Sequence, residues 1–305
     1  MMPLLVESIF GLGSFWLLFV WQEKCLLSSL LGALLGGYLP QYFNGLEKKG
    51  GNHWRPFQSW KLMYALCRHN PTTISVEEKL KDEKQYIFCS FPHGACSVNH
   101  FHTMTDGSGF LTNVHSGPRR DLCASILFCF PILREAMLYM GCVDAASSTA
   151  KYNLQRDRSL LIFIGGEKEQ LMTKPNQHKI FLRTRKGFVK LALEFGADLV
   201  PMYAFGENEL YDCSDFMMGF RQWLQKTFHI GIPVVFGWKN TLVPLPKPMG
   251  IEIGAPVKVT KKPKADITGA DIDRVHDEFM AAMARLFDRT KQKHGVAKDV
   301  KLEIC

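Results

Sequence analysis

The chain has 305 residues, of which 47% are hydrophobic, and carries a formal net charge of +8. This length is enough for one large domain or two small ones with a sizeable buried core. The positive charge suits an anionic partner, but it does not choose among nucleic acid, acidic membrane headgroups and a phosphate-bearing ligand. The nine cysteines include no C-x-x-C pair. Their distribution argues against a disulfide framework or a zinc ribbon and favours reduced thiols in a cytosol-facing domain.

Two apolar stretches open the chain. Residues 8–21 and residues 25–43 carry no charge, and a short charged segment separates them. As a helix, the second stretch would extend about 28 Å, close to the thickness of a bilayer core. A signal peptide should begin with Lys or Arg, whereas the only early charge here is Glu7. We predict a membrane-embedded hydrophobic hairpin within residues 1–50, which either spans the bilayer or dips into it.

Residues 51–305 are predicted to form one cytosol-facing domain, because Lys48 and Lys49 follow the apolar stretches and obey the positive-inside rule. Apolar runs typical of buried strands occupy residues 86–90, 160–164, 198–203 and 233–236. Helical periodicity occupies residues 185–195, closed by Gly196, and residues 271–293. Strands that alternate with helices predict an α/β fold, a mixed sheet flanked by helices.

His93 is the first candidate for chemistry. It lies between Pro92 and Gly94, directly after the first predicted strand. Proline fixes φ and glycine relaxes it, which indicates a tight turn at the carboxyl end of a strand, where open α/β sheets place their active sites. An imidazole titrates near pH 6.5 and can accept a proton in the cell. A structural histidine is the alternative. Cys96, three residues later, is predicted to be a buried structural thiol.

Two polar turns follow other predicted elements. Gly165 and Gly166 come after a strand and would let the backbone approach a ligand, with Glu167 and Glu169 beside them. The spacing differs from a P-loop, and a plain polar turn is the alternative. Residues 183–186 place three cations at the start of a helix, where the phosphates of coenzyme A would fit, although a solvated basic turn accounts for them equally well. The other histidines show no ligand spacing, so no metal site is predicted.

Several segments then resemble a known family. They are Pro-His-Gly at 92–94, Pro-Ile-Leu-Arg-Glu at 131–135, Gly-Gly-x-x-Glu at 165–169, Arg-Lys-Gly-Phe-Val-Lys-Leu-Ala-Leu at 185–193, Gly-Ala-Asp-Leu-Val-Pro at 196–201 and Phe-Gly-Glu-Asn-Glu at 205–209. From Tyr86 to just before His294, the chain resembles the type-2 diacylglycerol acyltransferase family, whose relatives include monoacylglycerol and wax-alcohol acyltransferases. Residues 185–209 are the most specific part of this resemblance.

The resemblance implies the α/β fold of glycerolipid acyltransferases, with the hairpin in the endoplasmic reticulum membrane and lipid droplets as a second location. It implies acyl-coenzyme A as co-substrate without a further cofactor, and diacylglycerol as acceptor, with monoacylglycerol or a wax alcohol as the alternative. His93 and Glu169 match catalytic residues of the family. The expected substrate-binding residues are Pro92, Gly94, Gly165, Gly166, Glu167, Arg185, Lys186, Gly187, Phe188 and Asn208.

Three positions depart from related patterns. Phe91 replaces the first histidine of His-Pro-His-Gly, so a role shared between two histidines is excluded. Glu167 stands where the family has an uncharged residue, which leaves open whether Glu167 or Glu169 acts, with the register favouring Glu169. Val98 stands where phosphate-recognising glycerolipid acyltransferases have Asp after their His, and residues 165–173 contain no Arg. A neutral acceptor is the simpler interpretation, with Glu169 as the carboxylate that orients His93.

Two rival functions are compatible with parts of the sequence. A serine or thiol lipid hydrolase would need a Gly-x-Ser-x-Gly elbow, and the sequence contains none. A non-catalytic membrane protein that binds acyl-coenzyme A or lipid would fit the hairpin and the basic turn equally well. No recognised nucleic-acid-binding motif accompanies the positive charge, so nucleic acid is not an expected partner. An oligomer is compatible with the sequence.

Overall fold

The computed structural model describes residues 24–30, 32–34, 36–228 and 231–305. The chain divides into two compact units, Met1–Gly45 and Leu46–Cys305. In the first unit the described residues are helical up to Tyr42, whereas residues 8–21 of the predicted hairpin lie outside the described part of the chain. Among the described residues, we find no helix with the length and apolar character needed to cross a bilayer.

A seven-stranded sheet forms the centre of the second unit. In spatial order its strands are β1 (Thr72–Val76), β10 (Met249–Ile253), β7 (Asp198–Phe205), β2 (Tyr86–Phe91), β5 (Ser159–Phe163), β3 (Arg119–Cys123) and β4 (Cys142–Asp144). The five strands from β7 to β4 are parallel to one another, and β10 pairs with β7 in the antiparallel sense. The predicted α/β fold with a mixed sheet and flanking helices is therefore confirmed.

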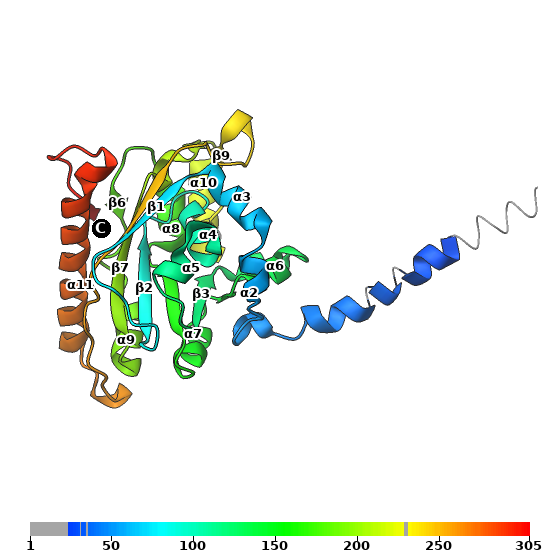
Figure 1. Cartoon of the computed structure of the whole chain (residues 1–305), viewed down its shortest axis with the longest axis horizontal. Helices are drawn as coiled ribbons and strands as arrows, with labels where there is room; N and C mark the ends of the chain where they lie inside the picture. The colour runs from blue at the N-terminus through cyan, green and yellow to red at the C-terminus, as the bar shows by residue number, and fades with distance from the viewer. Residues whose placement is uncertain (1–23, 31, 35, 229–230) are drawn as a thin grey trace, which may run out of the picture. The chain divides into compact units, whose positions relative to one another are not determined.

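Helices cover both faces of this sheet. Their bounds are α2 (Arg55–Gln58), α3 (Lys61–His69), α4 (Val98–Met104), α5 (Phe110–Asn113), α6 (Leu133–Tyr139), α7 (Ser147–Leu154), α8 (Gly166–Met172), α9 (Gly187–Phe195), α10 (Met218–Phe228) and α11 (Gly269–Thr290). Figure 1 shows α11 running along one side of the sheet, with α4 and α5 on the other side. The fold thus has three layers.

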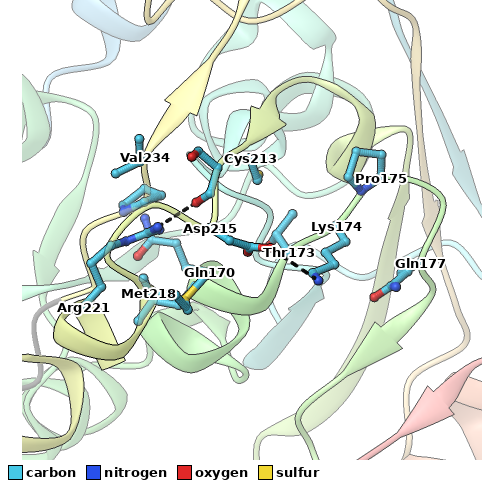
Figure 2. Close-up of a pocket in the computed structure, with 13 residues that line it drawn as sticks. Gln170, Thr173, Lys174, Pro175, Gln177, Cys213, Asp215, Met218, Arg221 and Val234 are labelled. Carbon is cyan, nitrogen blue, oxygen red and sulfur yellow. Dashed lines mark hydrogen bonds and ion pairs between the residues drawn. The ribbon is translucent and has the colours of Figure 1, made fainter. Parts of the chain in front are cut away.

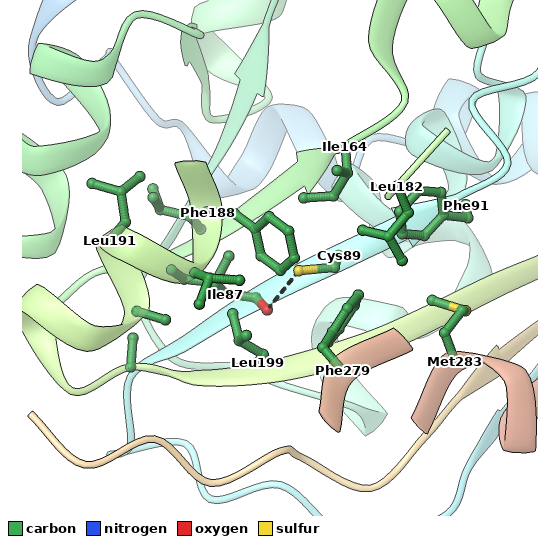
Figure 3. Packing of buried hydrophobic residues seen from close by; sticks show 14 of the residues in the cluster. Ile87, Cys89, Phe91, Ile164, Leu182, Phe188, Leu191, Leu199, Phe279 and Met283 are labelled. Carbon is green, nitrogen blue, oxygen red and sulfur yellow. Dashed lines mark hydrogen bonds between the residues drawn. The ribbon is translucent and has the colours of Figure 1, made fainter. Parts of the chain in front are cut away.

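The alternation of side chains along β2 explains why both faces need a helical layer. All six residues of β2 are buried, as expected for a central parallel strand. Ile87, Cys89 and Phe91 pack with residues of α9 and α11, among them Phe188 and Phe279 (Figure 3). Tyr86 and Phe88 face the opposite layer, which contains Phe110 of α5. This two-sided burial fixes the end of β2, and hence the position of the following turn.

Local signals set the bounds of the long helices. Gly196 ends α9 with a φ of +74°, a left-handed conformation that glycine adopts without strain. At the start of α11, the backbone N–H of Asp271 donates to the Thr268 hydroxyl, and the Thr268 N–H donates to the Asp271 carboxylate. The predicted helix 271–293 therefore begins two residues earlier, at Gly269, and continues after Thr290 as a short 3₁₀ turn (Lys291–His294).

One strand prediction needs correction. Residues 233–236 were expected to form a buried strand of the sheet. Only Val235 and Phe236 form a strand, β9, which pairs with β8 (Asp212–Cys213) in a separate two-stranded sheet. Phe236 is exposed. A second small sheet joins β6 (Lys179–Ile180) to β11 (Glu303–Ile304). An apolar run of four residues identifies a strand but not the sheet that it joins.

Candidate active site

His93 lies in the turn between β2 and α4, at the carboxyl end of a central strand. Gly94 has a φ of +65°, and Ser97, just before α4, has a φ of +49°. These left-handed residues turn the chain back over the sheet within a few residues. The His93 ring packs edge-on against Phe163 at the end of β5, with 5.3 Å between ring centres. The neighbouring strand thereby holds the side chain in place.

The hydrogen bonds of the imidazole define its tautomer. Nδ1 lies 3.0 Å from the carbonyl oxygen of Gly94, and because a carbonyl can only accept, Nδ1 carries the proton. The Ser97 hydroxyl donates to the His93 carbonyl and lies 3.0 Å from Nδ1. Burial lowers the pKa of the His93 imidazole to about 4, so the ring is neutral at cellular pH. Nε2 therefore carries the lone pair.

Glu169 makes its hydrogen bond to the backbone of His93, whereas the hydrogen bonds of the ring go to Gly94 and Ser97. Its Oε2 accepts a hydrogen bond from the His93 N–H, with an N to O distance of 3.3 Å. Glu169 is 3% exposed, and burial raises the pKa of its carboxyl to about 8. Gly165 lies against this carboxyl so closely that a Cβ at Gly165 would collide with it. We expected Glu169 to orient the imidazole, but the Gly94 carbonyl and Ser97 take that place.

Glu207 makes the corresponding contact on the other side of β2. Its carboxylate oxygens accept from the backbone N–H groups of Val98 (2.9 Å) and Asn99 (2.7 Å) at the start of α4. Glu207 is 1% exposed, and burial raises the pKa of its carboxyl to about 8 as well. A Cβ at Gly94 would overlap the Glu207 side chain. Glycine is required there for space as well as for its φ.

The turn that carries His93 is thus held by two buried glutamates from the two strands beside β2. Glu169 follows β5, and Glu207 follows β7 in a 3₁₀ turn (Glu207–Glu209). Since each buried carboxyl engages backbone N–H groups, removal of either one leaves buried donors without a partner. The arrangement fixes the histidine before any substrate arrives.

A large cavity opens beside His93. It has a volume of about 1020 Å³ and lies at the carboxyl ends of β2, β3 and β5. Apolar side chains make up much of its wall, among them Leu66, Leu122, Ile126, Phe163, Leu242 and Val243. Small-molecule sites span roughly 300–1,000 Å³, so this cavity is at the upper end of that range. Its size and apolar wall suit a long acyl chain together with a second lipid.

The structure brings four of the predicted site residues to this cavity: His93, Gly166, Glu167 and Arg185. Glu169, Pro92 and Asn208 lie behind it, around a void of about 10 Å³ that has room for one water molecule at most. Gly94 and Gly165 pack against the two buried glutamates. Cys96, predicted to be buried, is exposed and lines the cavity, so that prediction was wrong.

The residues of the basic turn before α9, and the first residues of that helix, lie in different environments. Arg185 lines the cavity. Of the described residues that line it, no other is an arginine or a lysine. Lys186 forms an ion pair with Asp273, at 2.5 Å, and Gly187 begins α9 with open space around it. Phe188 is buried in the core against Phe279, with ring centres 5.1 Å apart. Among these residues, Arg185 alone lies where it could contact a ligand in the cavity.

A second cavity lies on the other side of α8. It has a volume of about 330 Å³, and Gln170, Thr173, Cys213 and Arg221 are among the residues that line it (Figure 2). The Arg221 guanidinium donates to the backbone carbonyls of Ser214 and Ile232. The Arg221 guanidinium is therefore already hydrogen-bonded to the backbone. None of the predicted site residues lines this second cavity.

Sequence reasoning missed Ser97 and Glu207. Ser97 gave no signal, because a serine four residues after a histidine is an ordinary occurrence. Glu207 could have been found. Like Glu169, it is an acidic residue that follows a predicted buried strand and a glycine, and only its neighbour Asn208 was selected. Asn208 donates from its side chain to the Gln177 carbonyl, which connects two loops.

The known proteins that are similar to this chain are acyltransferases. The family model described as diacylglycerol acyltransferase matches residues 24–305. The chain is 33% identical over 272 residues to human diacylglycerol O-acyltransferase 2, covering 84% of this chain and 70% of that protein. It is 28% identical over 273 residues to mouse acyl-CoA wax alcohol acyltransferase 2, covering 84% and 81%. The 1-acyl-sn-glycerophosphate acyltransferase of Thermotoga maritima is 12% identical, with a TM-score of 0.44 over 75% of this chain and 79% of that one.

An α/β fold with a histidine beside a large apolar cavity, together with these relatives, defines an acyltransferase. The family model covers nearly the whole chain, and the resemblance noted from short motifs is confirmed. The chain belongs to the diacylglycerol acyltransferase family.

Proposed function

We propose that this protein transfers a fatty acyl group from acyl-coenzyme A to the free hydroxyl of diacylglycerol, with His93 as the general base. One observation carries the proposal: the His93 side chain, with Nδ1 bound to the Gly94 carbonyl, lines a largely apolar cavity of about 1020 Å³. Such a cavity can hold an acyl chain next to a neutral imidazole whose Nε2 lone pair can take a proton in the transition state.

The reaction divides into two proton transfers at one nitrogen. Nε2 of His93 takes the hydroxyl proton as the acceptor oxygen attacks the thioester carbonyl. When the tetrahedral intermediate collapses, the carbon–sulfur bond breaks and the coenzyme A thiolate takes the proton back from the imidazolium. A thiol with a pKa of about 8.5 leaves readily, so it needs little help from an acid. The Gly94 carbonyl and Ser97 stabilise the imidazolium by accepting from Nδ1.

Arg185 is proposed to bind a phosphate of coenzyme A. It is the cation on the cavity wall, and guanidinium groups suit phosphate oxygens. This role leaves no second described Arg or Lys on the wall for an acceptor phosphate, in keeping with a neutral acceptor. The names of the relatives support diacylglycerol first and a wax alcohol second.

The acceptor is tested with purified protein, labelled oleoyl-coenzyme A, and diacylglycerol, monoacylglycerol and hexadecanol as separate acceptors. We expect labelled triacylglycerol to form fastest. Wax ester as the sole product would contradict the proposed acceptor. Expression in cells that lack neutral-lipid synthesis repeats the test in a membrane, where triacylglycerol should accumulate.

We propose that the protein acts at the cytosolic face of the endoplasmic reticulum membrane. The apolar stretches before Lys48 and Lys49 support this location, by the same positive-inside argument as above. Carbonate-washed microsomes should retain the protein, and added protease should digest the domain after residue 51 without detergent. Release by carbonate, or protection from protease, would contradict this orientation.

A further inference from the structure

A cluster of soft ligands lies beside the cavity, on the face of the sheet that α4 covers. In the parallel pair of β3 and β4, Asp121 is opposite Cys142 and Cys123 is opposite Asp144. Because side chains alternate along a strand, Asp121, Cys123 and Cys142 point to the same face. His100 of α4 reaches this face, since its Nε2 lies 3.2 Å from Oδ2 of Asp121. The fold therefore places one imidazole and two thiols together.

The three side chains are close enough to share one ion. The ligand atoms of His100, Cys123 and Cys142 all lie within 4.8 Å of one another, and all three residues are buried. A tetrahedral zinc ion separates its nitrogen and sulfur ligands by roughly 3.6–3.8 Å. An approach of about 1 Å, within the range of small side-chain rotations, would complete such a geometry.

Asp121 and Arg119 are placed to orient His100 as a metal ligand. The His100 nitrogen that faces Asp121 donates to a carboxylate, which leaves the other nitrogen with its lone pair for a metal. Asp121 also accepts from Nε of Arg119 at 2.7 Å, so its own charge is paired. Two thiolates balance the charge of a divalent cation. The buried site as a whole would then carry no net charge and would avoid most of the desolvation cost.

We propose that His100, Cys123 and Cys142 bind a zinc ion, with its fourth position open to the cavity beside His93. One imidazole with two thiolates is a ligand set for zinc and not for magnesium or calcium, which prefer oxygen. His100 and Cys123 line the cavity, whereas Cys142 is fully buried behind them. The open position thus faces the space where a water or a lipid oxygen could bind. This inference does not depend on the identity of the acceptor.

The site would join three elements that surround the active site. His100 belongs to α4, directly after the turn that carries His93, while Cys123 and Cys142 belong to β3 and β4. Each cysteine thiol loses a proton when it binds the metal, so zinc uptake releases protons and weakens at low pH. The ligand spacing of 100, 123 and 142 has no recognisable motif, which is why the sequence predicted no metal.

The test is the metal content of the full-length protein, purified in detergent without chelator and supplied with zinc. We expect about one zinc per chain in the wild type. Cys123→Ser and Cys142→Ser should lose it, whereas Cys89→Ser, a fully buried cysteine on β2 outside the cluster, should retain it. A wild-type protein that stays free of zinc, or mass spectra that show a Cys123–Cys142 disulfide, would overturn the proposal.

Cobalt substitution gives a second readout that does not need a folded variant. Cobalt(II) added to wild-type protein stripped of metal should produce the thiolate-to-cobalt charge-transfer absorption, and added zinc should remove it. Zinc should also protect Cys123 and Cys142 from alkylation until a chelator is added. An absence of the cobalt absorption, with alkylation unchanged by zinc, would contradict the site even if both serine variants fail to fold.

Discussion

The backbone N–H of His93 donates a hydrogen bond to Oε2 of Glu169, so this glutamate positions the turn and not the imidazole. Burial raises the pKa of the Glu169 carboxyl to about 8, and at neutral pH the group is therefore mainly protonated. A glutamine offers the same acceptor oxygen at the same place. The negative charge of Glu169 is accordingly not required for its contact with His93.

The first prediction compares two substitutions of Glu169. Glu169→Gln should keep most of the acyl-transfer activity and the melting temperature, whereas Glu169→Ala should lower the free energy of unfolding by about 1–3 kcal/mol, because the His93 N–H loses its buried partner. Activity and thermal melts of both variants check this. Complete loss of activity in a well-folded Glu169→Gln protein would show that the charge takes part in the reaction.

A second prediction concerns Gly165, whose place against Glu169 leaves no room for a side chain. Its φ of −64° is one that any residue adopts, so crowding is the sole obstacle to alanine. Gly165→Ala should lower the free energy of unfolding by about 1–3 kcal/mol and reduce activity with it. Gly269→Ala, at the start of α11 with open space around it, is the matched control and should be neutral or stabilising. Equal stability of the two variants would contradict the packing argument.

The third prediction uses the pH dependence of stability. Burial raises the pKa of Glu207 to about 8, above the 4.5 of a solvated glutamate. Between these values the folded protein holds a proton that the unfolded chain has released, so this contribution to stability is present below pH 4.5 and is lost as pH rises through 8. Glu207→Gln cannot titrate and should show a smaller fall in melting temperature from pH 5 to 8. Identical slopes in the wild type and in Glu207→Gln would contradict the prediction.

A fourth prediction separates the cations of the basic turn. Arg185→Ala should raise the KM for acyl-coenzyme A by about tenfold or more, because a charged hydrogen bond to phosphate is lost, and should change kcat little. Arg183→Ala is the control, since Arg183 donates to the Ile304 carbonyl and does not line the cavity. Initial rates over a range of acyl-coenzyme A concentrations measure both. Equal KM values for the two variants would remove Arg185 from the binding site.

The central strands were predictable because most of their residues are apolar. β2, β5 and β7 follow the predicted runs to within two residues at each end. β3 was not predicted, because its first three residues, Arg119, Arg120 and Asp121, are charged. In the structure, Arg119 donates to the Thr103 carbonyl, and Arg120 donates to the Gly50 carbonyl. Partners from distant parts of the chain make such a charged strand stable, and local sequence patterns do not contain them.

The same distinction applies to the candidate site. His93 was predictable because its signals, a proline before it and a glycine after it at the end of a strand, are local. The roles of its neighbours were not, because they depend on the order of strands in the sheet. That order places the ends of β5 and β7 on either side of β2, and so brings Glu169 and Glu207 to one turn.

The most direct test is acyl transfer by His93→Ala. If Nε2 removes the proton from the acceptor hydroxyl, the rate of triacylglycerol formation should fall by about 10²–10⁴-fold. The melting temperature should change little, because the ring faces a cavity. His53→Ala, outside the cavity, should keep the wild-type rate. A His93→Ala protein that matches the wild-type rate at equal expression would contradict the mechanism.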